Sequence, residues 1–254
     1  MLATVGLFGP TPRLASQTTA PAPVVTFEQG DALEEKMQTK EALAVYLQLE
    51  RAGRKDADLL YRIAMEYSEL MPDAASPAEK QRLGGFAVDY AQRAVSADGK
   101  SGRAYLALAI AYGRNAFSQD NRTKLAYSRL VRANAETALR LDPQLDYAYY
   151  ILGAWNYEIA NMSFLRRELA TVIYGGLPDA SNAKAVEYLQ KAIELAPQRV
   201  SHHIELGRTY AVMGQPDLAR QELEKGLALP TRAKDDEEMK RIGRVVLKTL
   251  PQKK

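Results

Sequence analysis

Apolar and small residues recur at helical spacing along most of the chain, and the pattern is clearest from Ala183 to Gly226. Leu206 and Tyr210 lie four residues apart, as do Ala219 and Leu223. Residues at this spacing share one face of an α-helix. The stretch therefore predicts two amphipathic helices that pack against each other as a hairpin.

The complete spacing of this hairpin is specific. It reads His203-x2-Leu206-Gly207-x2-Tyr210-x3-Gly214-x4-Ala219-x3-Leu223-x2-Gly226. This pattern resembles the two-helix tetratricopeptide repeat. Gly207 and Ala219 fall where the two helices approach most closely, and a single hairpin of this kind cannot bury its apolar face alone. Neighbouring hairpins must therefore stack on it.

Four earlier stretches repeat the pattern less cleanly. In the first, Gly30 and Ala42 are 12 residues apart, as are Gly207 and Ala219 in the last. The same separation grows to 23, 22 and 32 residues in the units between them, at Ala64 to Ala87, Ala109 to Val131 and Gly153 to Ala185. Hairpins two, three and four are thus expected to carry extra residues between their two helices.

The longest extension predicts a helix of its own. It begins after Asn161 or Ser163, which are suitable N-caps, and ends at Gly175. Its apolar residues at helical spacing are Met162, Leu165, Leu169 and Val172. We expect this insert helix to lie with that stripe against the edge of the stack, or over it.

A last helix follows the break at Pro230 to Ala233. Its apolar stripe consists of Met239, Ile242, Val246 and Leu250. A solenoid with an open end needs such a cap. The sequence therefore predicts an all-α tetratricopeptide superhelix over residues 25–254, with five helical hairpins and a C-terminal capping helix.

Residues 1–24 are expected to lie outside this domain. The apolar run Leu2–Gly9 precedes a segment rich in Pro, Thr, Ala and Ser. It resembles the end of a secretory signal, although no basic residue comes before Arg13. A disordered leader is the alternative. A signal remnant predicts a periplasmic or secreted protein; otherwise a cytoplasmic location remains open.

Composition and charge narrow the classes of partner. Of 254 residues, 46% are hydrophobic and 26% charged, as in ordinary soluble proteins. A net charge of +3 without a basic block gives no reason to expect a nucleic-acid partner. The chain has no cysteine, and its apolar run is too short to span a bilayer. We expect no transmembrane segment.

No arrangement of residues indicates catalysis. The only histidines, His202 and His203, are neighbours that point about 100° apart on a helix, so they are expected to pack in the core or at the surface. The sequence contains no glycine-rich phosphate loop and no zinc-ligand spacing. We therefore expect no enzyme activity, no cofactor and no metal.

The first helix of each hairpin should line the concave side of the stack, where we expect an apolar trough with few charges. The inward positions are Tyr61, Met65, Leu106, Ile110, Tyr147, Tyr150, Ala154, Tyr157, Ile204 and Arg208. Such a trough suits an amphipathic helix or an acyl chain. The alternative is that some of these tyrosines only pack between repeats.

Hairpin four also carries a family resemblance. The signature is Gly153-Ala-Trp155 on the first helix, Phe164-Leu-Arg-Arg167 on the insert and Gly175-Gly-Leu-Pro178 after it, with Leu229-Pro-Thr231 before the last helix. It is similar to the tetratricopeptide domain of the regulator of microtubule dynamics proteins, over roughly residues 30–250. The resemblance implies a non-catalytic helical domain associated with microtubules and, in one branch, with phospholipid binding at organelle contacts.

Two functions follow as hypotheses. In the first, the protein is a scaffold that binds a partner protein or its amphipathic helix in the trough. In the second, the trough binds a phospholipid acyl chain beneath the insert helix, with Arg166 or Arg167 near the head group.

Overall fold

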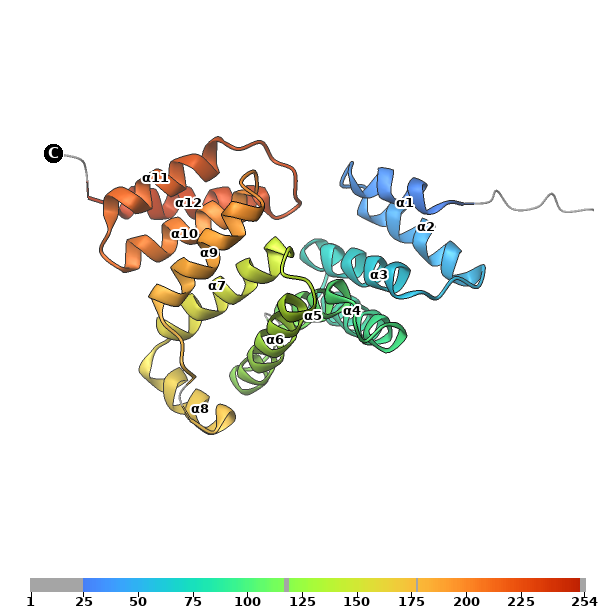
Figure 1. Cartoon of the computed structure of the whole chain (residues 1–254), viewed down its shortest axis with the longest axis horizontal. Coiled ribbons are helices and arrows are strands. Elements are labelled where there is room, and N and C mark those ends of the chain that lie inside the picture. The colour runs from blue at the N-terminus through green and yellow to red at the C-terminus, as the bar shows by residue number, and fades with distance from the viewer. Residues whose placement is uncertain (1–24, 117–118, 177, 252–254) are drawn as a thin grey trace, which may run out of the picture.

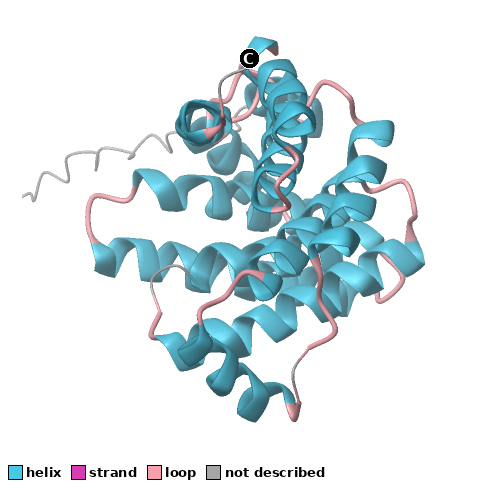
Figure 2. Ribbon diagram, turned by 90° about the vertical axis from the view of Figure 1, so that its left-hand side faces the viewer, coloured by secondary structure: helices cyan, strands magenta, loops and turns pink. Residues whose placement is uncertain are grey.

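Helices make up all the regular structure of the described residues, which are 25–116, 119–176 and 178–251 of a computed structural model. Figure 2 shows helices joined by loops, without a strand in that part of the chain. The predicted all-α class is confirmed. The predicted leader, residues 1–24, lies outside the described residues.

Consecutive helices pair into five hairpins that follow an arc (Figure 1). The pairs are α1 (Phe27–Glu34) with α2 (Thr39–Arg51), α3 (Ala57–Leu70) with α4 (Pro77–Ala97), α5 (Gly102–Ala116) with α6 (Asn121–Leu141), α7 (Asp146–Ala160) with α9 (Asn182–Leu195), and α10 (Val200–Val212) with α11 (Pro216–Ala228). A short 3-10 helix, η1 (Met71–Asp73), joins α3 to α4, and α8 (Phe164–Tyr174) lies between α7 and α9. A final single helix is α12 (Asp236–Thr249).

The extra residues of hairpins two and three lengthen their second helices. α4 and α6 contain 21 residues each, against 13 in α2 and α11. In hairpin four the extension forms α8, which starts after Ser163 and ends at Gly175 with a φ of 72°. A left-handed residue at this point stops a helix, and glycine adopts it without strain. The predicted positions of the extensions are confirmed.

The two helices of a hairpin touch at a glycine. A Cβ atom on Gly207 would lie 2.6 Å from Cγ of Leu223, and one on Gly153 would lie 2.5 Å from Cγ of Leu189. Both leucines are fully buried. The same contact thus recurs in hairpins four and five, which confirms the repeat frame predicted from Gly207.

The last helix covers the open end of hairpin five. Met239 packs in one cluster with Val200, Ile204 and Leu223, and its neighbours Ile242, Val246 and Leu250 are packed against that cluster. These are the four residues of the predicted stripe. α12 is therefore the predicted capping helix.

The orientation predicted for the insert helix is partly wrong. Ala170 is fully buried and Leu169 is half-buried, whereas Leu165 and Val172 are exposed. α8 packs against α6, the second helix of the preceding hairpin. Because this short helix carries apolar residues on both sides, spacing alone could not decide which side faces the stack.

Candidate functional site

The first helices of the hairpins form one side of the arc, which we call the concave face. Of the residues predicted to line it, six are half-buried, together with Ala154. These six are Tyr61, Met65, Tyr147, Tyr150, Tyr157 and Arg208. They come from hairpins two, four and five, so the structure brings distant parts of the chain to one surface.

Three predicted residues are buried instead. Leu106 and Ile110 belong to the core cluster between hairpins three and four. Ile204 is fully buried and contacts the backbone positions of Gly226 and Gly243 on α11 and α12. Neighbouring helices cover these side chains, so in this conformation a partner does not reach them.

An aromatic cluster joins hairpins four and five on this face. The ring centroids of Tyr147 and Tyr150 are 4.9 Å apart, and Tyr150 stacks on His202 at 5.3 Å. The guanidinium of Arg199 lies 5.6 Å from the centre of the Tyr147 ring. Tyr147 and Tyr150 also pack against core clusters. Inter-repeat packing, the alternative considered for the tyrosines, therefore describes part of their role.

Tyr157 differs from the other three tyrosines predicted to line the trough because it packs against none of the described core clusters. Its ring lies beneath the guanidinium of Arg208, 4.7 Å from the ring centre. Arg208 in turn donates a hydrogen bond of 2.7 Å to Glu205. This set offers a half-exposed aromatic surface that a partner can contact.

Glu205 is a buried carboxylate that is only partly satisfied. It is 3% exposed, and its Oε1 atom accepts no hydrogen bond. Burial raises its pKa, although Arg208 opposes the shift. A buried carboxylate with an unfilled acceptor is costly to leave as it is.

The concave face carries more charge than the sequence indicated. Glu66 is 3% exposed, and burial, with Glu34 and Glu69 nearby, raises its pKa to about 8. Burial also raises the pKa of Glu69, which accepts a 2.6 Å hydrogen bond from Arg114. The prediction of few charges is wrong. Extending the inward positions to Arg62, Glu66 and Glu69 on α3, at steps of four and three residues, could have found these groups.

A loop from the C-terminal part of the chain reaches across to hairpin two. Lys234 donates a 3.1 Å hydrogen bond to the carbonyl of Glu69 and pairs with Asp73. Asp235 lies 3.8 Å from Arg114 on α5. These contacts, which we call the latch, join residues before α12 to the ends of α3 and α5.

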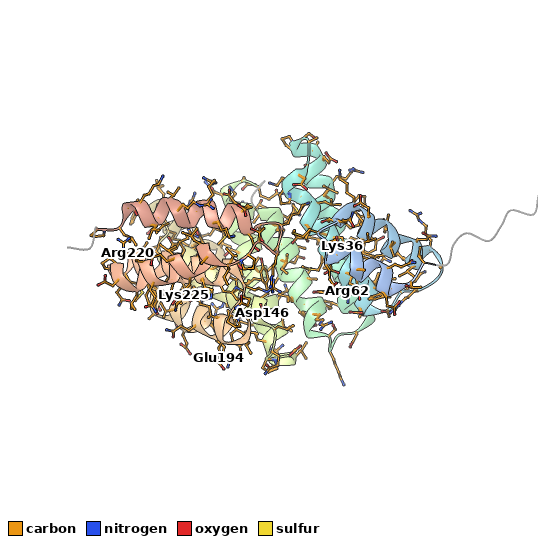
Figure 3. The ribbon with its side chains drawn as sticks, turned by 90° about the horizontal axis from the view of Figure 1, so that it is seen from above. Lys36, Arg62, Asp146, Glu194, Arg220 and Lys225 are labelled. Atoms are coloured by element: carbon orange, nitrogen blue, oxygen red, sulfur yellow. The ribbon has the colours of Figure 1, made fainter. Side chains whose placement is uncertain are left out.

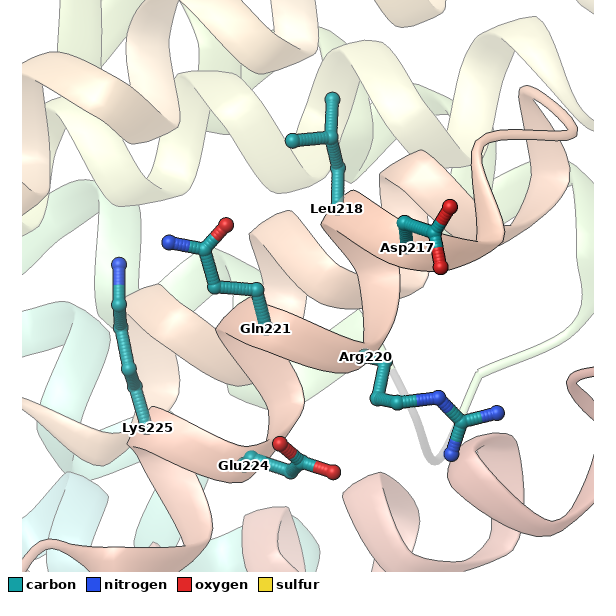
Figure 4. A pocket seen from close by; sticks show the side chains of 6 residues that line it. All are labelled: Asp217, Leu218, Arg220, Gln221, Glu224 and Lys225. Carbon is teal, nitrogen blue, oxygen red and sulfur yellow. The ribbon is translucent and has the colours of Figure 1, made fainter. Parts of the chain in front are cut away.

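A pocket of about 430 Å³ lies beside the latch. Its lining includes Tyr147, Pro197, Arg199, Ser201, Arg232 and Asp235. Another, of about 450 Å³, lies along α11, and Figure 4 shows the side chains that line it. It is lined by Asp217, Leu218, Arg220, Gln221, Glu224 and Lys225. Four charged side chains line each pocket, and in the pocket beside the latch apolar surface exceeds polar surface.

The two histidines hold neighbouring helices together. Nε2 of His202 lies 2.9 Å from Oδ2 of Asp146, and Nδ1 lies 3.3 Å from Oγ of Ser201. His203 contacts Glu222 at 2.7 Å and the carbonyl of Pro197 at 3.0 Å. Both side chains are buried, as core packing predicted. No cluster of three or more metal-ligating side chains occurs among the described residues.

The insert helix lies away from the concave face. Arg166 and Arg167 are exposed on α8, whose main partner is α6. Second helices of stacked hairpins form the outer side of the arc. The structure therefore does not bring these arginines to the trough, where the lipid hypothesis needs them.

In the described part of the chain, none of the helices combines the length and hydropathy that crossing a bilayer requires.

Arg62 and Asp146, labelled in Figure 3, mark two charged positions of the concave face, on α3 and α7. Arg62 pairs with Asp31 at 2.8 Å and Glu34 at 2.9 Å, while Asp146 pairs with Arg199 at 2.9 Å. Ion pairs therefore occupy both positions.

Comparison with known proteins gives consistent matches. The family model described as "Regulator of microtubule dynamics protein 1-3" matches residues 26–251. Regulator of microtubule dynamics protein 1 of Mus musculus is 27% identical over 213 residues, which cover 83% of this chain and 69% of that protein. Regulator of microtubule dynamics protein 2 of Mus musculus is 22% identical over 72% of this chain and 45% of its own length.

The crystal structure of a thermophilic TPR protein of Thermus thermophilus has a similar fold. Its TM-score is 0.61 at 18% identity, and the match covers 87% of this chain and 96% of that one. The tetratricopeptide superhelix predicted from the sequence is therefore confirmed.

Proposed function

The chain belongs to the regulator of microtubule dynamics protein family, and from this premise we propose that it is a non-catalytic scaffold that binds a partner protein on its concave face. The observation that carries the proposal is the pair of Tyr157 and Arg208, which are half-buried and held by the buried Glu205, while the neighbouring tyrosines pack against core clusters. Half-exposed aromatic and arginine side chains are frequent anchors of protein interfaces.

The carboxyl groups of the concave face favour a basic partner. Glu158 on α7 and Glu34 on α1 keep carboxylates that are 66% and 44% exposed, beside Arg208 and Arg62. A Lys or Arg side chain of a partner can pair with these exposed carboxylates. We therefore expect a partner segment that combines a basic side chain with apolar ones.

A peptide library selected on the immobilised protein tests this directly. We expect selected peptides to carry a Lys or Arg next to aromatic or aliphatic residues. Tyr157→Ala should weaken their binding on the order of tenfold, the usual loss at an interface anchor. Tyr127→Ala, on the second helix α6, is the matched control and should bind as the wild type does. Equal binding by Tyr157→Ala would refute the concave site.

The family name makes microtubules the first protein partner to examine. Wild-type protein and both tyrosine variants are sedimented with microtubules assembled from purified tubulin. Co-sedimentation of wild type and Tyr127→Ala, with loss for Tyr157→Ala, supports direct binding through the concave face. Absence of wild-type protein from the pellet would refute direct microtubule binding and leave the peptide selection to judge the concave site.

The lipid alternative finds little support. Four charged side chains line each of the two pockets described above, and Arg166 and Arg167 lie on the other side of the arc. Lipid extraction and mass spectrometry of the purified protein is the direct comparison. A stoichiometric co-purified phospholipid would favour the alternative over a peptide-binding face.

A further inference from the structure

The outer side of α8 carries the three most exposed large apolar side chains of the described residues. Phe164 is 75% exposed, Leu165 82% and Val172 79%, and the next, Val245, is 54% exposed. Isolated apolar residues on a surface are common, but a contiguous group is not. This group is therefore a candidate docking surface.

Helix geometry places the three residues together. At about 100° per residue, Phe164, Leu165 and Val172 fall within roughly 100° of the helix circumference. Ala170 points to the opposite side and is fully buried. The helix thus uses one face to pack on the stack and leaves a second apolar face open, which we call the α8 outer face.

The helices of this region, α6 and α8, carry a net positive charge. α6 and α8, which pack together, contain seven basic residues and two acidic ones. The basic residues are Arg122, Lys124, Arg129, Arg132, Arg140, Arg166 and Arg167, and the acidic ones are Glu136 and Glu168. The two helices therefore carry +5, while the whole chain carries only +3. Acidic residues outnumber basic ones in the remainder.

The size of the surface limits what can cover it. A helix of 11 residues is about 16 Å long and presents far less than the roughly 800 Å² per partner that a standard protein interface buries. A second copy seated on it would also bring Arg167 close to the same arginine of its mate. A bilayer surface needs only a few inserted apolar side chains and nearby cations.

We propose that the α8 outer face docks the protein on the surface of an anionic lipid bilayer, with Phe164, Leu165 and Val172 inserted among the head groups and Arg167, at the edge of that face, beside the lipid phosphates. Glu168 lies between Phe164 and Val172 on this face and opposes the docking, since its carboxylate meets a negative surface. Docking in this orientation leaves the concave face free.

Flotation of the full chain with vesicles tests the proposal. Wild-type protein should bind vesicles that mix phosphatidylcholine equally with phosphatidylserine, bind phosphatidylcholine alone weakly, and dissociate as salt is raised. The triple variant Phe164→Ser, Leu165→Ser, Val172→Ser should lose at least about tenfold in partitioning. Arg167→Gln should lose roughly fivefold, whereas Arg166→Gln, on the side of α8 that faces the stack, should lose less.

Glu168→Gln is the most informative variant in the flotation experiment, because docking predicts that it binds anionic vesicles more strongly than wild type. Removing this carboxylate should strengthen binding several-fold, which a purely structural role would not produce. Val245→Ser, at an exposed apolar position of α12, and Tyr157→Ala are controls that should bind as wild type does. Circular dichroism checks that every variant retains its helices.

Three outcomes would overturn the proposal. Wild-type protein could fail to bind the mixed vesicles, or the triple variant could bind as strongly as wild type. Alternatively, light scattering could show a wild-type dimer that the triple variant converts to a monomer, which would assign the α8 outer face to a second copy. The result for Tyr157→Ala separates this test from that of the concave site.

Discussion

Asp146 and His202 meet across the junction of hairpins four and five, with Oδ2 of the carboxylate 2.9 Å from Nε2 of the imidazole. Burial lowers the pKa of His202, so the neutral ring donates from Nε2 and accepts from Ser201 at Nδ1. Burial alone would raise the pKa of Asp146, but the hydrogen bond from His202 and the charge of Arg199 hold it below its ordinary value.

This pair makes stability depend on pH. Because the folded pKa of His202 is lowered, the unfolded chain binds a proton first as the solution is acidified. Wild-type stability should fall as the pH drops through about 6.5, the ordinary pKa of histidine. His202→Gln should flatten that part of the profile. Urea midpoints of both proteins, measured at several pH values around 6.5, test this prediction. If the midpoint of His202→Gln fell with pH as steeply as that of wild type, the role assigned to His202 would be wrong.

Glu66 predicts the opposite dependence. Its pKa is about 8 in the fold against an ordinary 4.5, so between these values the folded chain keeps a proton that the unfolded chain releases. Stability should therefore decline as pH rises through this window. Glu66→Gln, which mimics the protonated acid, should be more stable than wild type by roughly 2–4 kcal/mol near pH 8, with little difference near pH 4.5. Glu194→Gln, exposed on α9, serves as the neutral control.

Two glycines should respond oppositely to the same substitution. Gly207→Ala would press a methyl group on Leu223, whose Cγ lies only 2.6 Å away, and should cost about 1–3 kcal/mol. Gly85 is exposed on α4, and a Cβ atom there would meet nothing within 4 Å. Gly85→Ala should therefore raise the free energy of unfolding by about 0.5–1 kcal/mol. Chemical denaturation measures both, and similar changes would contradict the assigned close contact.

Lys234→Ala should open the latch at little cost in overall stability. Its ion pair with Asp73 is partly exposed, and such pairs contribute about 0–1 kcal/mol. Hydrogen exchange should quicken in residues 229–235 and at the end of α3. Lys225→Ala removes a comparable exposed ion pair on α11, and exchange at α3 should then stay as in wild type. Unchanged exchange in both variants would mean that the latch contacts are weak.

The repeat frame could be predicted because the two helices of a hairpin pack closely only where the sequence has a small residue. A glycine on the first helix faces a leucine on the second at the same position of hairpins four and five, as Gly207 faces Leu223. The same holds for the capping helix, whose stripe fits the exposed end of hairpin five. These features depend on neighbours within one or two helices.

The concave face was harder to predict because burial there depends on contacts distant in sequence. Ile204 follows the inward spacing but is covered by α12, and Glu66 lies beside a loop that arrives 165 residues after Glu69. The side of α8 that packs on the stack could not be predicted from spacing, since apolar residues occupy two sides of the helix. Which tyrosines face a partner stays a prediction.

The latch changes how the array comes apart. In an open solenoid each repeat meets only its neighbours, so hairpins can unzip one by one from either end. The hydrogen bond from Lys234 to Glu69 closes hairpins two to five into a ring. Within a ring, unfolding of hairpin two breaks the contacts of the loop before α12, and unfolding of that loop breaks the contacts at the end of α3. We therefore expect these hairpins to unfold as one cooperative unit, with hairpin one, outside the ring, as the part free to fray by itself.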